Sequence, residues 1–140
     1  KYPDAKFIFI YRDPVSVYHS SEYLWKITQQ QVSVQEIQHA EIQDLILSTY
    51  ELLLSNYLQQ RKEIPQEQLI EVNYKNLQQD PLGEIRKIYS KLELGTPPEK
   101  ELADFLAANK SYTNKIYSTS DDLKKMLAAK WSFAFEEWPD

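Results

Sequence analysis

Glycine is the residue whose scarcity most constrains this chain. Only Gly83 and Gly95 occur among its 140 residues, and they are not close together. Loops that wrap the phosphates of a nucleotide in backbone need at least two closely spaced glycines, because the chain must turn tightly and approach the phosphate. These residues therefore contain neither a Walker-type loop nor a G-x-G-x-x-G loop. Any nucleotide site within them is built from side chains and helix ends.

Length and composition indicate one folded domain, residues 1–140. Hydrophobic residues make up 42% of the chain and aromatic residues 13%, which is too apolar for a disordered segment. The net charge of −5 argues against a general affinity for nucleic acid or anionic membranes, although it allows a local basic pocket. Because there is no cysteine, disulfides, thiolate catalysis and Cys-ligated zinc are excluded, and no other motif indicates a metal.

No segment has the length or pattern of a membrane span or a secretory leader. The longest apolar run, Phe7–Tyr11, is as long as a strand and far short of the roughly 18–20 residues that cross a bilayer. The first residue is Lys1 rather than Met, and a strand begins almost at once. We therefore expect a processed, excised or truncated chain. The sequence does not determine its compartment, with the cytoplasm slightly favoured.

The first strand and its helix are the clearest local prediction. Lys6–Tyr11 is apolar almost throughout, which is typical of a strand covered on both faces in a parallel sheet. After Arg12, Asp13 is a good N-cap and proline a good first helical residue, so we expect a helix over Pro14–Thr28. Gln29–Gln31 then reads as a polar connection.

The rest of the chain predicts one more strand and several helices. Ser33, with Glu36 in a capping box, starts a long helix to about Arg61 whose apolar stripe is expected to face the core. Gln68–Asn73 is the second strand, and helices are expected over residues 81–92, over 99–108 and from 121 to at least 133. The order strand–helix–helix–strand–helix predicts an α/β fold with two parallel strands and a majority of helix.

Arg12 and Ser20 form a candidate anion site. In open α/β sheets, ligands bind beyond the carboxyl ends of the strands, and Arg12 directly follows the first strand. Its planar fork of donors matches two phosphate oxygens, Ser20 adds a neutral donor, and the start of a helix attracts anions. These features fit a single phosphate. The alternative is that Arg12 pairs with Asp13 or Glu22 and that Ser20 is incidental.

Longer stretches resemble a known family. Residues 2–8 (YPDAKFI), 11–14 (YRDP) and Ser20 resemble the 3′-phosphate-binding segment of sulfotransferases, whose donor is 3′-phosphoadenosine 5′-phosphosulfate (PAPS). Residues 70–77 (IEVNYKNL) with Asp80 and Pro81 are similar to the family's second motif, and residues 82–94 to the helix after it. Residues 114–120 resemble its later N-x-Y-x-L-S segment more weakly.

The resemblance implies a donor site and a partial fold. It implies that Arg12 and Ser20 bind the donor's 3′-phosphate, that Tyr74 lies near the adenine, and that the sheet is part of a P-loop-like one. Lys75 and Asn76 depart from it, since they replace two acidic residues of the family pattern. The family's loop for the 5′-phosphosulfate and its catalytic base precede this segment, so we expect the chain to be inactive alone. The partners implied are the nucleotide and a hydroxyl- or amine-bearing acceptor.

Two other interpretations stay open on the sequence alone. One is a non-catalytic module that keeps the fold and binds a nucleotide weakly or not at all. The other is a relative of P-loop kinases, in which an arginine after a strand could serve phosphoryl transfer. Of the two histidines, His19 is next to Ser20 but is expected to have a surface or structural role, and His39 is expected on a polar side of the long helix without a catalytic role. In the family, another strand lies against the one that Lys6–Tyr11 resembles. These residues do not include that strand, so we expect an open hydrophobic edge and self-association of the chain.

Overall fold

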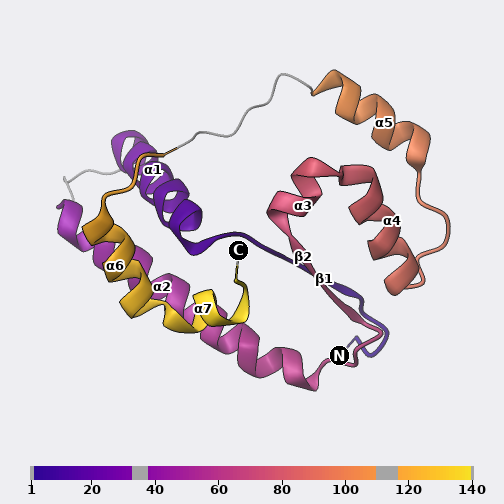
Figure 1. The fold of residues 1–140 in the computed structure, drawn as a ribbon, viewed down its shortest axis with the longest axis horizontal. Coiled ribbons are helices and arrows are strands. Elements are labelled where there is room, and N and C mark those ends of the chain that lie inside the picture. Colours follow the sequence, from indigo (N-terminus) through magenta and orange to yellow (C-terminus); the bar gives the residue numbers. More distant parts are fainter. Residues whose placement is uncertain (1, 33–37, 110–116, 140) are drawn as a thin grey trace. The chain divides into compact units, whose positions relative to one another are not determined.

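The fold is described by a computed structural model that covers residues 2–32, 38–109 and 117–139 (Figure 1). The chain divides into two compact units, and each is assembled from two stretches of sequence. The first unit comprises Lys1–Arg12 and Arg61–Ile116, and the second comprises Asp13–Gln60 and Tyr117–Asp140. The expected single domain over residues 1–140 stays a prediction.

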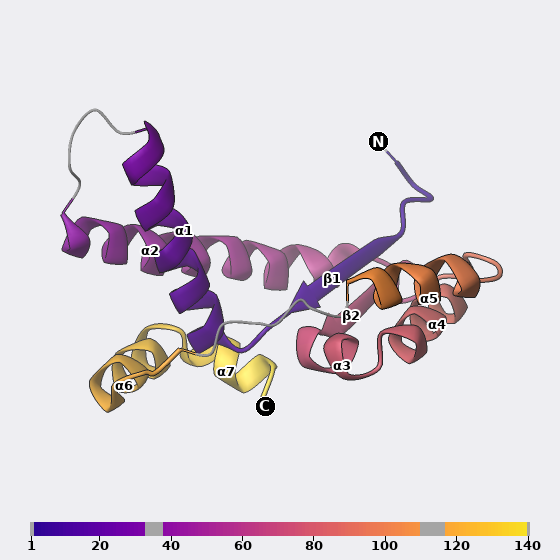
Figure 2. The ribbon, with the colours of Figure 1, turned by 90° about the horizontal axis from the view of Figure 1, so that it is seen from above.

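The first unit contains the predicted pair of parallel strands. Strand β1 (Phe7–Tyr11) pairs in parallel with β2 (Leu69–Asn73), and the register places Phe7 opposite Leu69 and Tyr11 opposite Asn73. A short 3-10 turn, η1 (Arg61–Glu63), precedes β2. Both strands and their parallel relation are therefore confirmed, and with them the α/β class of the fold (Figure 2).

Three helices follow β2 in the first unit. They are α3 (Tyr74–Gln79), α4 (Pro81–Lys91) and α5 (Glu99–Ala108). Helix α3 was not expected; it starts because the Asn73 side chain accepts a hydrogen bond from the backbone N–H of Lys75. Asp80 ends α3 and caps α4, accepting from the N–H of Gly83 at 2.9 Å. The small core beneath these helices consists of Val72, Ile88 and Leu92, with Ile70 and Leu77 packed against it.

Strand β1 is less covered than its apolar sequence predicts. Phe7, Ile8 and Ile10 are 43%, 48% and 51% exposed, so the expectation of a strand buried on both faces is not met. The physical reason is that the sheet has only two strands among the described residues. Apolar surface that a larger parallel sheet would bury is therefore left in contact with solvent.

The second unit is entirely helical. Helix α1 (Pro14–Val32) is capped by Asp13, whose Oδ1 accepts from the N–H of Ser16 at 2.7 Å, as predicted. Helix α1 runs through Gln29–Gln31, which the sequence analysis wrongly assigned to a connection. Helix α2 (His39–Gln60) is the predicted long helix, while its expected cap at Ser33 and Glu36 lies outside the described residues. Helices α6 (Asp121–Lys130) and α7 (Ser132–Glu137) complete the unit.

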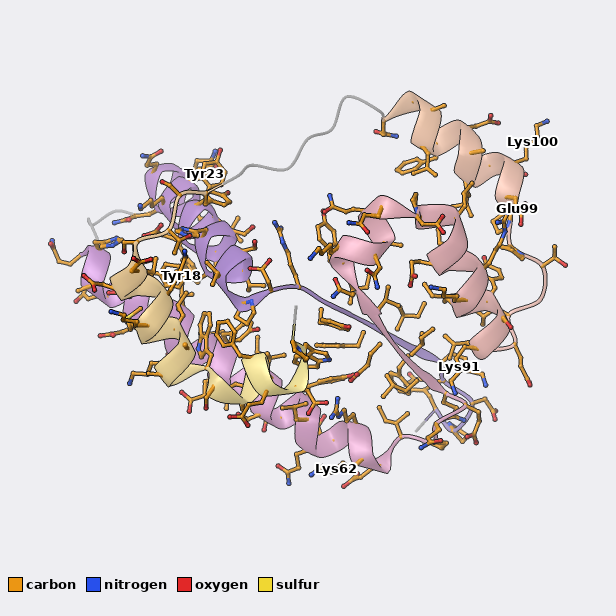
Figure 3. All side chains as sticks on the ribbon, viewed as in Figure 1. Tyr18, Tyr23, Lys62, Lys91, Glu99 and Lys100 are labelled. Carbon is orange, nitrogen blue, oxygen red and sulfur yellow. The ribbon has the colours of Figure 1, made fainter. Side chains whose placement is uncertain are left out.

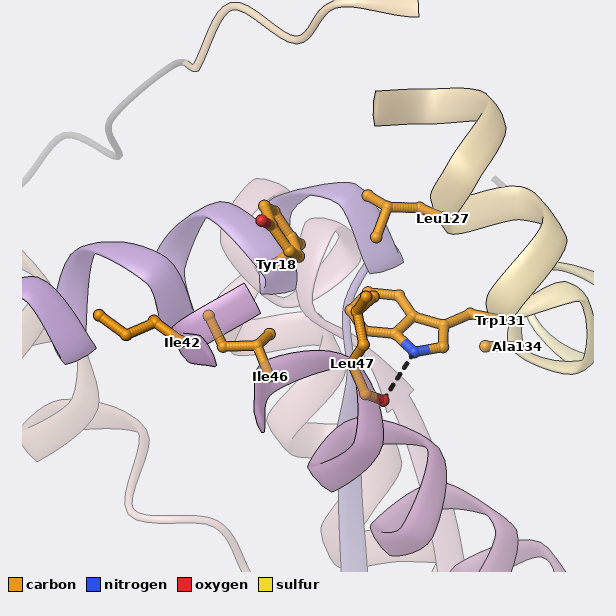
Figure 4. Close-up of a cluster of buried hydrophobic side chains, with 7 residues drawn as sticks. All are labelled: Tyr18, Ile42, Ile46, Leu47, Leu127, Trp131 and Ala134. Atoms are coloured by element: carbon orange, nitrogen blue, oxygen red, sulfur yellow. Dashed lines mark hydrogen bonds between the residues drawn. The ribbon is translucent and has the colours of Figure 1, made fainter. Parts of the chain in front are cut away.

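An aromatic side chain joins these helices at the centre of the second unit. Trp131 is fully buried, and its indole Nε1 donates to the backbone carbonyl of Leu47 in α2 at 3.1 Å (Figure 4). Trp131 also interrupts the last helix, which was expected to be continuous, and separates α6 from α7. The buried residues around it are Tyr18, Ile42, Ile46, Leu47, Leu127 and Ala134.

The apolar stripe of α2 is only partly a core face. Ile42 and Ile46 are buried, but Leu52 and Leu53 near its other end are 62% and 63% exposed. The prediction that the whole stripe faces the core is therefore wrong for that end of the helix. Periodicity shows that a face is apolar but not what covers it. None of the helices in the described part of the chain is long and apolar enough to cross a membrane.

Candidate functional site

The fold brings Arg12 and Tyr74 together. Each residue directly follows one of the two strands, and Tyr11 and Asn73 before them are register partners. The parallel pairing therefore delivers both side chains to the same edge of the sheet. The guanidinium carbon of Arg12 lies over the Tyr74 ring, 5.0 Å from its centroid. This edge is where open α/β sheets bind their ligands.

The contact between the two side chains defines how the guanidinium is presented. A cation over an aromatic face is attracted by the ring quadrupole, and the contribution is about 0.5–1 kcal/mol at an exposed site. A guanidinium is planar and its N–H donors lie in that plane, so a ring beneath it restricts the direction of the donors. Bidentate recognition of phosphate or sulfate oxygens requires that geometry. Arg12 and Tyr74 are thus the two residues of the candidate site whose contact the structure shows.

Ser20 belongs to the other unit. It is exposed on α1, two turns after the start of that helix. Its part in the site therefore stays a prediction. The start of α1 is also less available to an anion than the sequence suggests, because the Asp13 carboxylate caps it. A carboxylate there satisfies one free N–H group and offsets part of the positive end of the helix dipole.

Glu22, one of the two carboxylates suggested as an alternative partner of Arg12, has other partners. The Glu22 carboxylate lies 3.5 Å from the Lys26 ammonium, one turn further along α1, and 3.5 Å from Nε2 of His39. Glu22 therefore has partners within the second unit. His39 itself is mostly exposed.

His19 makes two contacts that the sequence did not predict. Its ring is buried, and Nε2 lies 2.8 Å from the hydroxyl oxygen of Thr119. The ring also stacks on Tyr117, with centroids 5.0 Å apart and planes 12° from parallel. His19 therefore joins α1 to the segment before α6, directly beside Ser20 in sequence.

The first unit also contains a pocket. Its volume is about 440 Å³, and none of Arg12, Ser20 and Tyr74 lines it. The chemistry of the candidate site thus rests on the residues at the carboxyl ends of the strands rather than on this pocket. Within residues 2–32, 38–109 and 117–139, no group of three or more metal-ligating side chains comes together.

Comparison with known proteins identifies the family. A sequence model described as the sulfotransferase family matches residues 1–98, a stretch that includes both strands and Arg12, Ser20 and Tyr74. The chain therefore belongs to the sulfotransferase family. This membership favours the sulfotransferase interpretation over the relative of P-loop kinases.

Two curated relatives cover nearly the whole chain. Omega-hydroxy-beta-dihydromenaquinone-9 sulfotransferase Stf3 of Mycobacterium bovis is 29% identical over 132 residues, which is 93% of this chain. The protein of the same name from Mycobacterium tuberculosis gives the same values. The chain spans 34% of the length of these relatives. No solved structure is significantly similar to it.

Proposed function

We propose that this chain supplies the 3′-phosphate and adenosine side of a PAPS site in a sulfotransferase. In this proposal Arg12 and Ser20 hold the 3′-phosphate, and Tyr74 contacts the adenine. The observation that carries it is the contact between Arg12 and Tyr74 at the carboxyl edge of the parallel strands. Two residues that the family resemblance names separately are thereby neighbours in the fold.

The reaction places different demands on the two ends of the donor. A sulfonate group passes from PAPS to an acceptor oxygen: the new bond joins sulfur to that oxygen, and the bond from sulfur to the phosphate oxygen breaks. 3′-Phosphoadenosine 5′-phosphate leaves, and a base takes the proton of the acceptor hydroxyl. Transfer needs in-line placement of acceptor and leaving group. Anchoring the 3′-phosphate far from sulfur contributes to placement and binding rather than to bond breaking.

Residues outside these 140 would complete the site. The sulfonate end needs donors that stabilise charge on its oxygens, and this chain has no glycine-rich loop to provide them. The acceptor would be a hydroxyl or an amine. The curated relatives are named for a hydroxylated menaquinone, and we extend to this chain only the class of a hydroxyl-bearing acceptor. We expect the chain alone to bind the nucleotide without transferring sulfonate.

The test is a calorimetric titration of the chain with 3′-phosphoadenosine 5′-phosphate. Replacing Arg12 by alanine should weaken binding at least tenfold, because a bidentate charged contact is worth about 1.5–3 kcal/mol. Tyr74→Leu should weaken it less, since it removes the stacking surface but leaves the cation. Ser20→Ala tests the neutral donor and should have the smallest effect.

Arg86→Ala provides the matched control. Arg86 is also an arginine of the first unit, but its guanidinium is paired with both carboxylate oxygens of Glu99 at 2.6 and 3.0 Å. That variant should bind the nucleotide like the parent chain. Equal affinity of the Arg12→Ala variant and the parent would contradict the assigned site. Failure of a folded parent chain to bind at all would favour the non-catalytic module.

A further inference from the structure

The pocket of the first unit lies toward the amino ends of the strands, whereas Arg12 and Tyr74 follow their carboxyl ends. It is about 440 Å³ in volume, within the range of small-molecule sites. Its lining residues come from η1, from the approach to β2, from β2 itself and from the end of α4: Arg61, Lys62, Ile64, Gln66, Leu69, Glu71 and Lys91.

Strand direction separates this pocket from the proposed donor site. Leu69 is the first residue of β2, whereas Tyr74 follows the last one. With a rise of about 3.3 Å per residue, the two ends of the strand are about 13 Å apart. The pocket is therefore at the amino end of the parallel pair, and a ligand in it would not replace PAPS at Arg12.

The pocket carries a positive charge, although the chain as a whole is acidic. Three basic residues and one carboxylate line it, in a chain whose net charge is −5. The carboxylate, Glu71, accepts from the Arg61 guanidinium at 2.7 Å, so it is already engaged with a cation. Among the residues that the structure describes, neither Lys62 nor Lys91 has a carboxylate partner. Figure 3 labels both lysines.

The apolar part of the lining narrows the class of ligand. Ile64 and Leu69 are half-buried side chains of the pocket wall, and Gln66 adds an amide. A bare inorganic anion would use the lysines but leave this wall in contact with water. A molecule that joins an anionic group to a compact carbon frame would use both.

We propose that this pocket is a second binding site, for a small organic anion that carries a phosphate or carboxylate group on an apolar body. Lys62 and Lys91 bind the anionic group, and Ile64 and Leu69 contact the body. Arg61 is held in the wall by Glu71. The site is independent of the proposed donor site, because the two share no residue.

The probe for this proposal is phenyl phosphate, titrated into isotope-labelled chain and followed by amide NMR. Shifts should appear at the pocket residues 61–71 and at Lys91. Replacing both lysines in a Lys62→Glu, Lys91→Glu variant should weaken binding at least tenfold, since two favourable charge contacts become repulsive. Inorganic phosphate should bind more weakly than phenyl phosphate, and benzoate should shift the same amides.

Two control variants make the result specific. Lys124→Glu with Lys125→Glu makes the same change of charge on exposed lysines of α6, and it should leave the affinity unchanged. Arg12→Ala should also leave the pocket shifts intact, which separates this site from the donor site. The proposal is overturned if the pocket amides do not shift, or if the α6 variant loses as much affinity as the pocket variant. Inorganic phosphate binding as tightly as phenyl phosphate would overturn the apolar part of it.

Discussion

Tyr50 is a residue whose environment makes the stability of the chain depend on alkaline pH. Its ring centroid lies 4.1 Å from that of Trp131 in the core of the second unit. Burial, and secondly the nearby Asp13 carboxylate, raise the pKa of Tyr50 to about 12. Both effects disfavour the phenolate, because its charge would be poorly solvated and would repel the carboxylate.

The sign of the pH dependence follows from this raised pKa. The unfolded chain releases the Tyr50 proton near its ordinary pKa of 10.0, whereas the folded chain keeps it to about 12. The stability that Tyr50 contributes is therefore complete below pH 10 and is lost as the pH rises from 10 to 12. We expect Tyr50→Phe to lose less stability than the parent chain between pH 9 and pH 11.5, measured as the midpoint of urea unfolding. Tyr2 is 75% exposed and serves as the control. If Tyr2→Phe reduced the alkaline loss of stability as much as Tyr50→Phe, the pH dependence would not come from Tyr50.

At the scale of elements, His19 attaches the segment before α6 to α1. It does so through the hydroxyl of Thr119 and the ring of Tyr117. Replacing His19 by alanine removes both contacts at a buried position. We expect the amide hydrogens of residues 117–123 to exchange several-fold faster, because a typical buried hydrogen bond contributes about 0.5–1.5 kcal/mol to local stability.

The matched control for His19 is the other histidine of the second unit. His39 is 60% exposed and lies near one carboxylate at 3.5 Å, so His39→Ala should leave exchange in residues 117–123 unchanged. Mass spectrometry of proteolytic peptides measures both variants. Unchanged exchange in His19→Ala would show that α6 is held by its other contacts, chiefly those of Leu127 and Trp131 with the core.

Most of the elements were predictable because their signals are local. The two strands, the cap at Asp13 and the cap at Asp80 follow from apolar runs and from residues beside the helix ends. The break at Trp131 was not predicted, and its indole donates to the carbonyl of Leu47, a residue far away in sequence whose proximity no local pattern indicates. The short helix α3 was missed for a related reason, since Asn73 ends a strand and caps a helix at once.

The residues of the candidate site stay a prediction, whereas the contact between two of them is seen only in the fold. The family resemblance named Arg12, Ser20 and Tyr74 from sequence alone. That Arg12 lies over Tyr74 depends on the register of β1 against β2, which no local pattern determines. The basic pocket was not predicted at all, because Lys62 and Lys91 belong to elements separated by a strand and a helix. Their proximity exists only in the folded chain.

At the scale of the whole molecule, the exposed apolar strand predicts self-association. Ile8 and Ile10 are each about half exposed on β1, and a two-stranded sheet leaves unpaired edges among the described residues. Exposed edges of this kind pair readily with other strands. We expect the mean mass of the chain in sedimentation experiments to rise with concentration, and a variant with Ile8→Thr and Ile10→Thr to remain monomeric at higher concentrations.

A control variant for the self-association experiment also replaces two exposed apolar residues by threonine, but in a helix rather than in β1. Leu52→Thr with Leu53→Thr changes two exposed apolar residues of α2, which belongs to the other unit. If β1 is the contact, that variant should associate like the parent chain. A parent chain that stays monomeric at millimolar concentration would contradict the prediction.

The parallel pairing of β1 with β2 also sets an order of events during synthesis. Phe7 pairs with Leu69, so the first strand leaves the ribosome before its partner has been made. At about 5–20 residues per second, roughly sixty residues of α1 and α2 take about 3–12 s to synthesise. Throughout that interval the pairing of β1 with β2 cannot form. A chaperone that binds extended apolar segments could therefore hold β1 during that interval, and its release would be timed by the appearance of β2.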